Sequence, residues 1–166
     1  PRGQVYISTN STIDWLYAAC LNFTANGTHS SEDSQAGSTS LAGTNLSQLE
    51  SMFGISSVDV DGVDETFNVQ TGIGGHSPFY VGSQSFTEGE CRSTRLFTDA
   101  GEGEAGKFEE VLLYEPRTTS VIFTSILNQD LTGFDAKKHD FEALVLENGH
   151  GTDTSTTAYY FFVELQ

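Results

Sequence analysis

Two apolar runs joined by a tight corner, at residues 106–126, form the clearest pattern in the chain. In GKFEEVLLYEPRTTSVIFTSI the β-branched and aromatic residues typical of strands fill 108–114 and 119–126. The corner between them is Glu115-Pro116-Arg117-Thr118, and proline presets the backbone for a turn. This stretch therefore predicts an antiparallel hairpin with Pro116 in its turn.

Runs of the same kind recur along the chain, mostly separated by Gly, Asp, Asn or Pro. They predict further strands at residues 4–8, 57–63, 66–69, 79–86, 92–98, 139–146 and 154–164. Their connections are short enough for hairpins, which favours an antiparallel sheet. In the last run apolar side chains occupy both alternating faces, which predicts a strand that is covered on both sides.

The segment 13–23 has helical spacing instead. Asp14 is placed where a negative charge suits the start of a helix. Apolar residues recur there every three or four positions, at Ile13, Leu16, Tyr17, Cys20 and Leu21. We expect an N-terminal helix over this segment, and at best a short second helix over 46–53.

These elements predict an α+β fold that is mostly β. Its core would be a curved antiparallel sheet of about seven to nine strands with one N-terminal helix; the alternative is an all-β sandwich with one short helix. The length of 166 residues fits a single domain, 1–166. Ser, Thr, Gly and Asn dominate from about 24 to 45, which predicts a flexible insertion.

The chain is strongly acidic, with 23 Asp and Glu against 7 Lys and Arg and a net charge of −16. It has no basic cluster to neutralise phosphates, which argues against nucleic acid and against an anionic membrane surface as partners. No apolar run approaches the ~20 residues of a spanning helix, and the N-terminus lacks the pattern of a signal peptide. We expect a mature, soluble chain that does not insert into a membrane.

Sequons and cysteines point to an oxidising compartment. The four N-x-[ST] acceptors are Asn10, Asn22, Asn26 and Asn45. Cys20 and Cys91 form an even pair, for which a disulfide and two buried free thiols are the alternatives. We expect a secreted, extracellular or lumenal glycoprotein with a disulfide; a salt-rich environment is the other explanation of the charge.

The order of elements resembles a known superfamily. At the N-terminus the carrying residues are Val5–Ser8 followed by Ile13-Asp-Trp-Leu-Tyr. Further along they are the turn Gly89-Glu-Cys-Arg92, the strand 93–97, the glycine-rich turn 101–106, the run from Phe108, and Gly149-His-Gly-Thr152 before the last strand. This order is similar to that of the START/Bet v 1-like superfamily, especially its polyketide-cyclase-like branch, and implies a helix-grip fold. The chain departs from the family because no long C-terminal helix follows the last strand.

The resemblance implies a cavity for a small apolar molecule over the sheet. Its tentative ligand-binding residues are Arg92, Arg95, Glu109, Tyr114, Phe123 and Tyr160. Cyclase-like chemistry would use one of the strand charges, Tyr114, His76 or His139 as a general acid or base. Ordinary roles are the alternative: Arg92 and Arg95 pair with acidic neighbours, and the aromatic residues form the core. That aromatic set is Phe79, Tyr80, Phe97, Phe123, Phe134, Phe141, Tyr160 and Phe162.

No pattern predicts a catalytic residue, a cofactor or a metal ion. The acidic run Asp59-Val-Asp61-Gly-Val-Asp64-Glu65 does not fit an EF-hand loop and is interpreted as a solvated turn. The histidines are scattered singly and are interpreted as surface or turn residues: His29, His76, His139 and His150.

Two functions therefore remain open. The first is binding of a small apolar or amphipathic ligand over the curved sheet, with cyclase-like catalysis as an option. The second is an extracellular structural or adhesive glycoprotein subunit that assembles with other protein subunits by β-strand addition.

Overall fold

The computed structural model describes residues 3–21, 50, 51, 53–56, 62–67, 75–97, 107–146 and 156–166. Within these residues the chain is mostly β, and all the strand pairs are antiparallel, as predicted. The predicted insertion at 24–45 lies outside the described residues. The short helix at 46–53, except for residues 50, 51 and 53, and most of the predicted strand at 57–63 also lie outside them.

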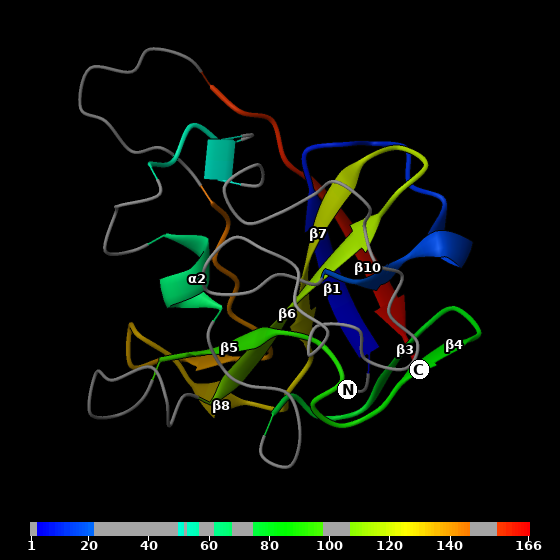
Figure 1. Cartoon of the computed structure of the whole chain (residues 1–166). Helices are drawn as coiled ribbons and strands as arrows, with labels where there is room; N and C mark the ends of the chain where they lie inside the picture. The colour runs from blue at the N-terminus through cyan, green and yellow to red at the C-terminus, as the bar shows by residue number, and fades with distance from the viewer. Residues whose placement is uncertain are drawn as a thin grey trace.

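A six-stranded sheet forms the centre of the molecule (Figure 1). Its strand order is β10-β1-β7-β6, and both β2 and β5 pair with the outer edge of β6. The bounds are β1 Gly3–Ser8, β2 Ala19–Cys20, β5 Ser93–Leu96, β6 Phe108–Glu115, β7 Ser120–Ile126 and β10 Tyr160–Leu165. The strand at the N-terminal end of the chain therefore lies between two strands from its C-terminal half.

The hairpin predicted at 106–126 is confirmed as β6 and β7, which pair from Glu110 opposite Ser125 to Glu115 opposite Ser120. The Glu115 carboxylate closes the turn by accepting hydrogen bonds from the backbone N–H groups of Arg117, at 2.6 Å, and Thr118, at 3.0 Å. A local pattern that needs no distant partner thus folds as its sequence indicates.

Two chain segments share the outer edge of β6 end to end. The N–H of Leu112 donates to the carbonyl of Arg92, at 3.1 Å, and its own carbonyl accepts from the N–H of Leu21, at 3.1 Å. The disulfide between Cys20 and Cys91 joins the two segments next to this junction. The predicted disulfide is confirmed, and it fixes two short strands that would otherwise be held by few backbone hydrogen bonds.

The N-terminal helix predicted over 13–23 is wrong. The segment forms one 3-10 turn, η1 (Trp15–Tyr17), and then enters β2. Asp14 makes no side-chain cap, and Leu16 and Tyr17 are exposed. The open edge of β6 takes Ala19 and Cys20 as strand partners, and this tertiary pairing overrides the helical spacing.

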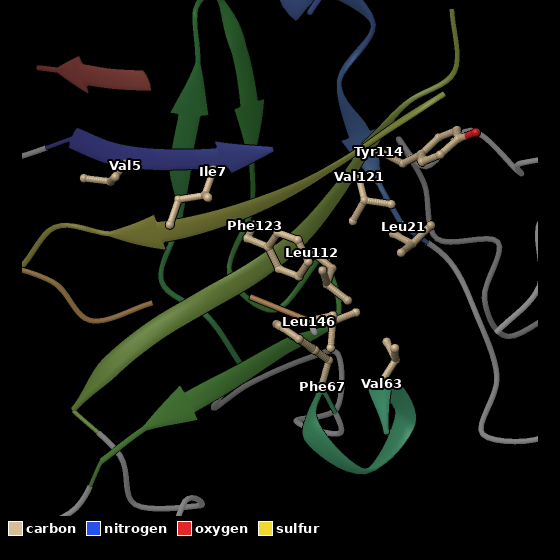
Figure 2. Packing of buried hydrophobic residues seen from close by; sticks show 10 residues of the cluster. All are labelled: Val5, Ile7, Leu21, Val63, Phe67, Leu112, Tyr114, Val121, Phe123 and Leu146. Atoms are coloured by element: carbon tan, nitrogen blue, oxygen red, sulfur yellow. The ribbon is translucent and has the colours of Figure 1, made fainter. Parts of the chain in front are cut away.

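The central strands are buried on both faces because their apolar residues alternate between two clusters. We call core one the cluster of Val5, Ile7, Leu21, Val63, Phe67, Leu112, Tyr114, Val121, Phe123 and Leu146. Core two consists of Tyr6, Ala18, Cys20, Phe79, Val81, Phe86, Cys91, Val111, Leu113 and Ile122. Figure 2 shows Val63 of the short helix α2 (Val63–Thr66), and Phe67 directly after it, pointing from below the sheet toward core one.

Smaller elements cover the two faces, and several differ from the predicted strands. The run 79–86 is a hairpin of β3 (Phe79–Val81) and β4 (Gln84–Phe86), which covers core two. Thr66 ends helix α2 and does not begin a strand. Of 139–146 only His139 is in a strand, since β8 (Leu131–Thr132) pairs with β9 (Lys138–His139). We call residues 141–146, which have no regular structure and reach core one through Leu146, the strap.

Several of the aromatic residues interpreted as core are in fact exposed. Tyr80, Phe134, Phe141 and Tyr160 all expose a large part of their side chains. Phe79 and Phe123 are buried as expected. The last predicted strand, 154–164, is also shorter, because β10 begins only at Tyr160.

Candidate functional site

Strand β10 is the outermost strand of the sheet and carries the most exposed apolar row among the described residues. It pairs with β1 on one side, so that Ile7 lies opposite Phe161 and Val5 opposite Val163. Phe161, Val163 and Leu165 therefore lie on the core-one face, yet they are 63 %, 63 % and 71 % exposed. The prediction that this strand is covered on both sides is wrong for this face, which leaves three apolar side chains in water.

The opposite face of β10 is firmly anchored. Phe162 packs edge-on against Trp15, with ring centroids 5.2 Å apart. The Tyr6 hydroxyl donates to a Glu164 carboxylate oxygen at 2.7 Å, and the N–H of Gly82, in the β3–β4 turn, donates to the same carboxylate at 3.1 Å. Burial, and then the hydrogen bond and charge of Glu164, raise the pKa of Tyr6, which stays neutral. The only charge of β10 is thus engaged within its own chain.

Gly3 permits the close pairing of β1 and β10. Its φ is +143°, and a Cβ at this position would lie 2.0 Å from the carbonyl oxygen of Glu164. No other residue type fits this backbone without moving one strand. Gly3 and the Tyr6–Glu164 contact therefore both anchor the C-terminal end of the edge strand.

The β10 edge lacks the usual protection against pairing with another strand. Natural edge strands commonly carry lysine, proline or a bulge, which interfere with the addition of a further strand. The six residues of β10, YFFVEL, contain neither lysine nor proline, and they pair with β1 without interruption from Ser8 opposite Tyr160 to Gly3 opposite Leu165. This regular, apolar strand is suited to accept another.

The six residues tentatively assigned to a ligand do not converge. Tyr114 and Phe123 are buried in core one. Arg95 of β5 pairs with Glu109 of β6. This pair lies at the edge of the sheet opposite to β10, which contains Tyr160. Arg92 lies half-buried just before β5. The sheet brings Arg95 and Glu109 together, and Tyr114 and Phe123, but it does not gather the set around one space.

Arg95 pairs with an acidic neighbour. Its guanidinium lies 3.3 Å from a carboxylate oxygen of Glu109 and donates to the carbonyl of Gly75 at 2.9 Å. Glu109 also accepts a hydrogen bond from the N–H of Ser77, at 2.8 Å. These groups fasten the segment before β3 to the sheet edge.

Two histidines lie in the described part of the chain, and they differ. His139 is half-buried and pairs with Asp135, its Nε2 lying 2.7 Å from a carboxylate oxygen. That hydrogen bond is the main cause that lowers the pKa of Asp135 to about 2. The interpretation of His76 as a surface or turn residue is wrong, because its side chain is fully buried beside core two.

Within the described ranges, no group of three or more His, Cys, Asp or Glu side chains is placed to hold a metal ion. No helix in these ranges is long and apolar enough to cross a membrane. The acidic residues of the run 59–65 are either not described or have side chains that are not described.

Of the four sequons only Asn10 is described. Its Nδ2, the atom that would carry a glycan, donates to the hydroxyl of Ser120 at 3.0 Å, and its Oδ1 accepts from the N–H of Thr12 at 2.9 Å. A glycan on this nitrogen would compete with the contact to Ser120 in the folded chain. Asn22, Asn26 and Asn45 lie outside the described residues.

Sequence reasoning missed Glu110, a fully buried carboxyl group in the middle of β6. Its Oε2 accepts a hydrogen bond from the N–H of Leu144 in the strap, at 2.9 Å, while Oε1 has no hydrogen-bond partner in the structure. Burial is the main cause that raises its pKa to about 8. The signal available was the run Phe-Glu-Glu-Val, in which strand alternation must turn one of two adjacent glutamates inward.

Comparison with protein-family models, with curated proteins and with solved structures gives no match to this chain.

Proposed function

We propose that this chain is an extracellular assembly subunit, and that its edge strand β10 pairs with β10 of a second copy. The observation that carries the proposal is the row of Phe161, Val163 and Leu165, which is exposed on an unprotected edge. The disulfide between Cys20 and Cys91 supports the oxidising environment that an extracellular subunit requires.

A second copy suits this edge because the row is self-complementary. A two-fold axis normal to the sheet keeps every side chain on its own face, so it pairs residues of equal parity. Centred on Val163, it places Val163 opposite Val163 of the second copy and Phe161 opposite Leu165. Three apolar side chains from each copy then meet on one face, and the contact closes as a dimer.

The charges of the chain permit a second copy at the contact itself but oppose its approach at long range. Glu164 is directed to the other face, where Tyr6 and Gly82 bind it, so no like charges meet on the apolar face. Each copy nevertheless carries −16, and repulsion between exposed charges is screened beyond about 8 Å in physiological salt. Added salt should therefore strengthen the dimer. A basic partner at the same edge would instead bind more weakly in salt.

The contact is small. With on the order of 100 Å² offered by each of the three apolar side chains, a two-fold contact buries about 600 Å² in both copies together, which is below the usual size of a specific interface. We therefore expect a reversible dimer that forms in the micromolar range or above. Weak single contacts of this kind gain strength when several act together, as in an assembly or an adhesive layer.

Sedimentation equilibrium over a range of protein concentrations tests the proposal. Val163→Lys places a charge in the centre of the apolar row and should abolish self-association. Phe134→Lys is the matched control, because Phe134 is similarly exposed, at 73 %, but belongs to the β8–β9 loop. Equal self-association of both variants and the wild type, or a monomer at all concentrations and salt levels, would contradict the proposal.

Binding of a small apolar ligand is the second candidate. It is favoured by the unpartnered Oε1 of Glu110, since apolar sites commonly contain a few polar groups that orient the ligand. On that face, however, core one and the strap cover the sheet, so a ligand would have to displace Leu146 and its neighbours. Native mass spectrometry before and after gentle organic extraction tests it: a lost mass of small-molecule size supports the candidate, and identical apo masses contradict it.

A further inference from the structure

His76 is a buried histidine with both ring nitrogens engaged. Its Nε2 lies 2.9 Å from the backbone nitrogen of Cys91, and its Nδ1 lies 2.8 Å from the carbonyl oxygen of Ser77. A backbone N–H can only donate and a carbonyl can only accept, so Nε2 accepts and Nδ1 carries the proton. The ring is therefore neutral, in one defined tautomer, and it meets Phe79 edge-on at 5.3 Å.

This one residue closes the segment 76–91, which contains the β3–β4 hairpin. The backbone carbonyl of His76 accepts from the N–H of Gly89, at 2.9 Å, while its ring accepts from Cys91. Cys91 is in turn bound to Cys20 through the disulfide. The two ends of the segment are thus joined at His76, beside the covalent link to β2.

Four charged groups surround this closure. Glu88 and Glu90 follow β4, and Glu90 accepts from the N–H of Thr87 at 2.6 Å. Glu109 approaches from β6, where it pairs with Arg95 of β5. Burial lowers the pKa of His76, and the Ser77 carbonyl and the carboxylates of Glu109, Glu90 and Glu88 oppose this effect only in part. A charged ring is disfavoured inside the fold, but it would meet three carboxylates on leaving it.

We propose that His76 is a proton-operated clasp that holds the segment 76–91 closed when its ring is neutral and releases it when Nε2 takes up a proton. The protonated ring is a donor at both nitrogens, so two donors face each other at Cys91 and that hydrogen bond is lost. The ring then moves toward the carboxylates, and the β3–β4 hairpin lifts from core two. This inference is independent of the proposed assembly through β10.

The sign follows from the lowered pKa. The open segment takes up a proton near the ordinary histidine pKa of about 6.5, whereas the closed segment takes it up only at lower pH. Opening therefore becomes more favourable as the pH falls below that value, by up to about tenfold for each pH unit, until the closed form also binds the proton. Above it the clasp is fully closed.

Amide hydrogen exchange, corrected for the intrinsic pH dependence of exchange, measures this opening at Cys91 and at the paired residues of β3 and β4. In the wild type we expect protection to fall about tenfold per pH unit below ~6.5, while β7 keeps its protection. His76→Gln keeps an acceptor near Cys91 but cannot be protonated, so its protection should not change with pH. His139→Gln is the control and should behave as the wild type.

Two results would overturn the proposal. One is an unchanged pH dependence in the His76→Gln variant. The other needs no variant: an NMR titration of the His76 ring in the wild type, in which the ring becomes protonated while the Cys91 amide keeps its protection. If His76→Gln does not fold, the wild-type titration alone decides between a clasp and a merely structural histidine.

Discussion

Replacing Glu110 by Gln removes a buried ionisable group without changing its size. Glu110 is fully buried, and none of the ion pairs between described residues includes it. The hydrogen bond from Leu144 fixes the strap over core one and can equally be accepted by an amide oxygen. The substitution therefore isolates the cost of keeping a carboxyl group in an apolar interior.

The magnitude follows from the two pKa values. Folding raises the pKa of Glu110 from 4.5 to about 8, so the folded state holds a proton that the unfolded chain has lost. Stability from this group is complete below pH 4.5 and declines as the pH rises toward 8. At about 1.4 kcal/mol per pH unit, the wild type loses on the order of 3 kcal/mol between pH 4.5 and neutrality, and the variant loses none of this.

The assay is urea unfolding followed by the fluorescence of Trp15, the single tryptophan, over a series of pH values. The quantity of interest is the pH dependence of the difference in free energy of unfolding between Glu110→Gln and the wild type. Contributions from His76 and other groups cancel in this difference. The exposed substitution Asp130→Asn is the control, because asparagine tolerates the positive φ of 52° at that position.

We expect the free energy of unfolding of the variant, relative to that of the wild type, to increase steadily from acidic to mildly alkaline pH. At acidic pH the two should be nearly equal, since the added NH₂ takes the place of an oxygen that already lacks a partner. A difference that does not change with pH would refute the reasoning, because it would mean that Glu110 is as easily ionised in the folded state as in water.

Two further predictions concern the covalent and steric anchors of the sheet. The double variant Cys20→Ala/Cys91→Ala removes a disulfide that spans a sequence separation of 71. Its free energy of unfolding in urea should fall by on the order of 4 kcal/mol. An unchanged free energy of unfolding would show that β2 and β5 do not need the disulfide. Gly3→Ala places a Cβ against the carbonyl oxygen of Glu164 and should reduce amide protection throughout β10 while β6 and β7 keep theirs; normal protection in β10 would contradict the close approach.

The parts of the fold that depend on neighbouring residues could be predicted from the sequence. The β6–β7 hairpin needs only alternation and Pro116. The segment 13–23 shows the limit, since its helical spacing is overridden by pairing of Ala19 with Tyr114, far away in the chain. The strap has a strand-like composition, but its backbone bonds to side chains instead, including Ser125, whose hydroxyl donates to the carbonyl of Glu142 at 2.7 Å.

The candidate site was less predictable because alternation shows which face a side chain takes, but not whether that face is covered. Phe123 and Phe161 are the same residue type in apolar strands, yet one is central and buried and the other is at the edge and exposed. Their difference depends on strand order, which no local pattern contains. In the same way, Glu109 and Glu110 are two adjacent glutamates, and Glu110 is buried because the strap covers it.

Pairing of β10 with a second copy is tested most directly at the backbone of Tyr160–Leu165. In an added strand pair, the N–H groups of β10 that point away from β1 become hydrogen-bonded. Amide hydrogen exchange should therefore show these alternate amides becoming protected as the protein concentration rises, with a larger effect at higher salt. If the protein associates while these amides exchange as fast as in the monomer, the copies meet elsewhere and the proposed edge is wrong.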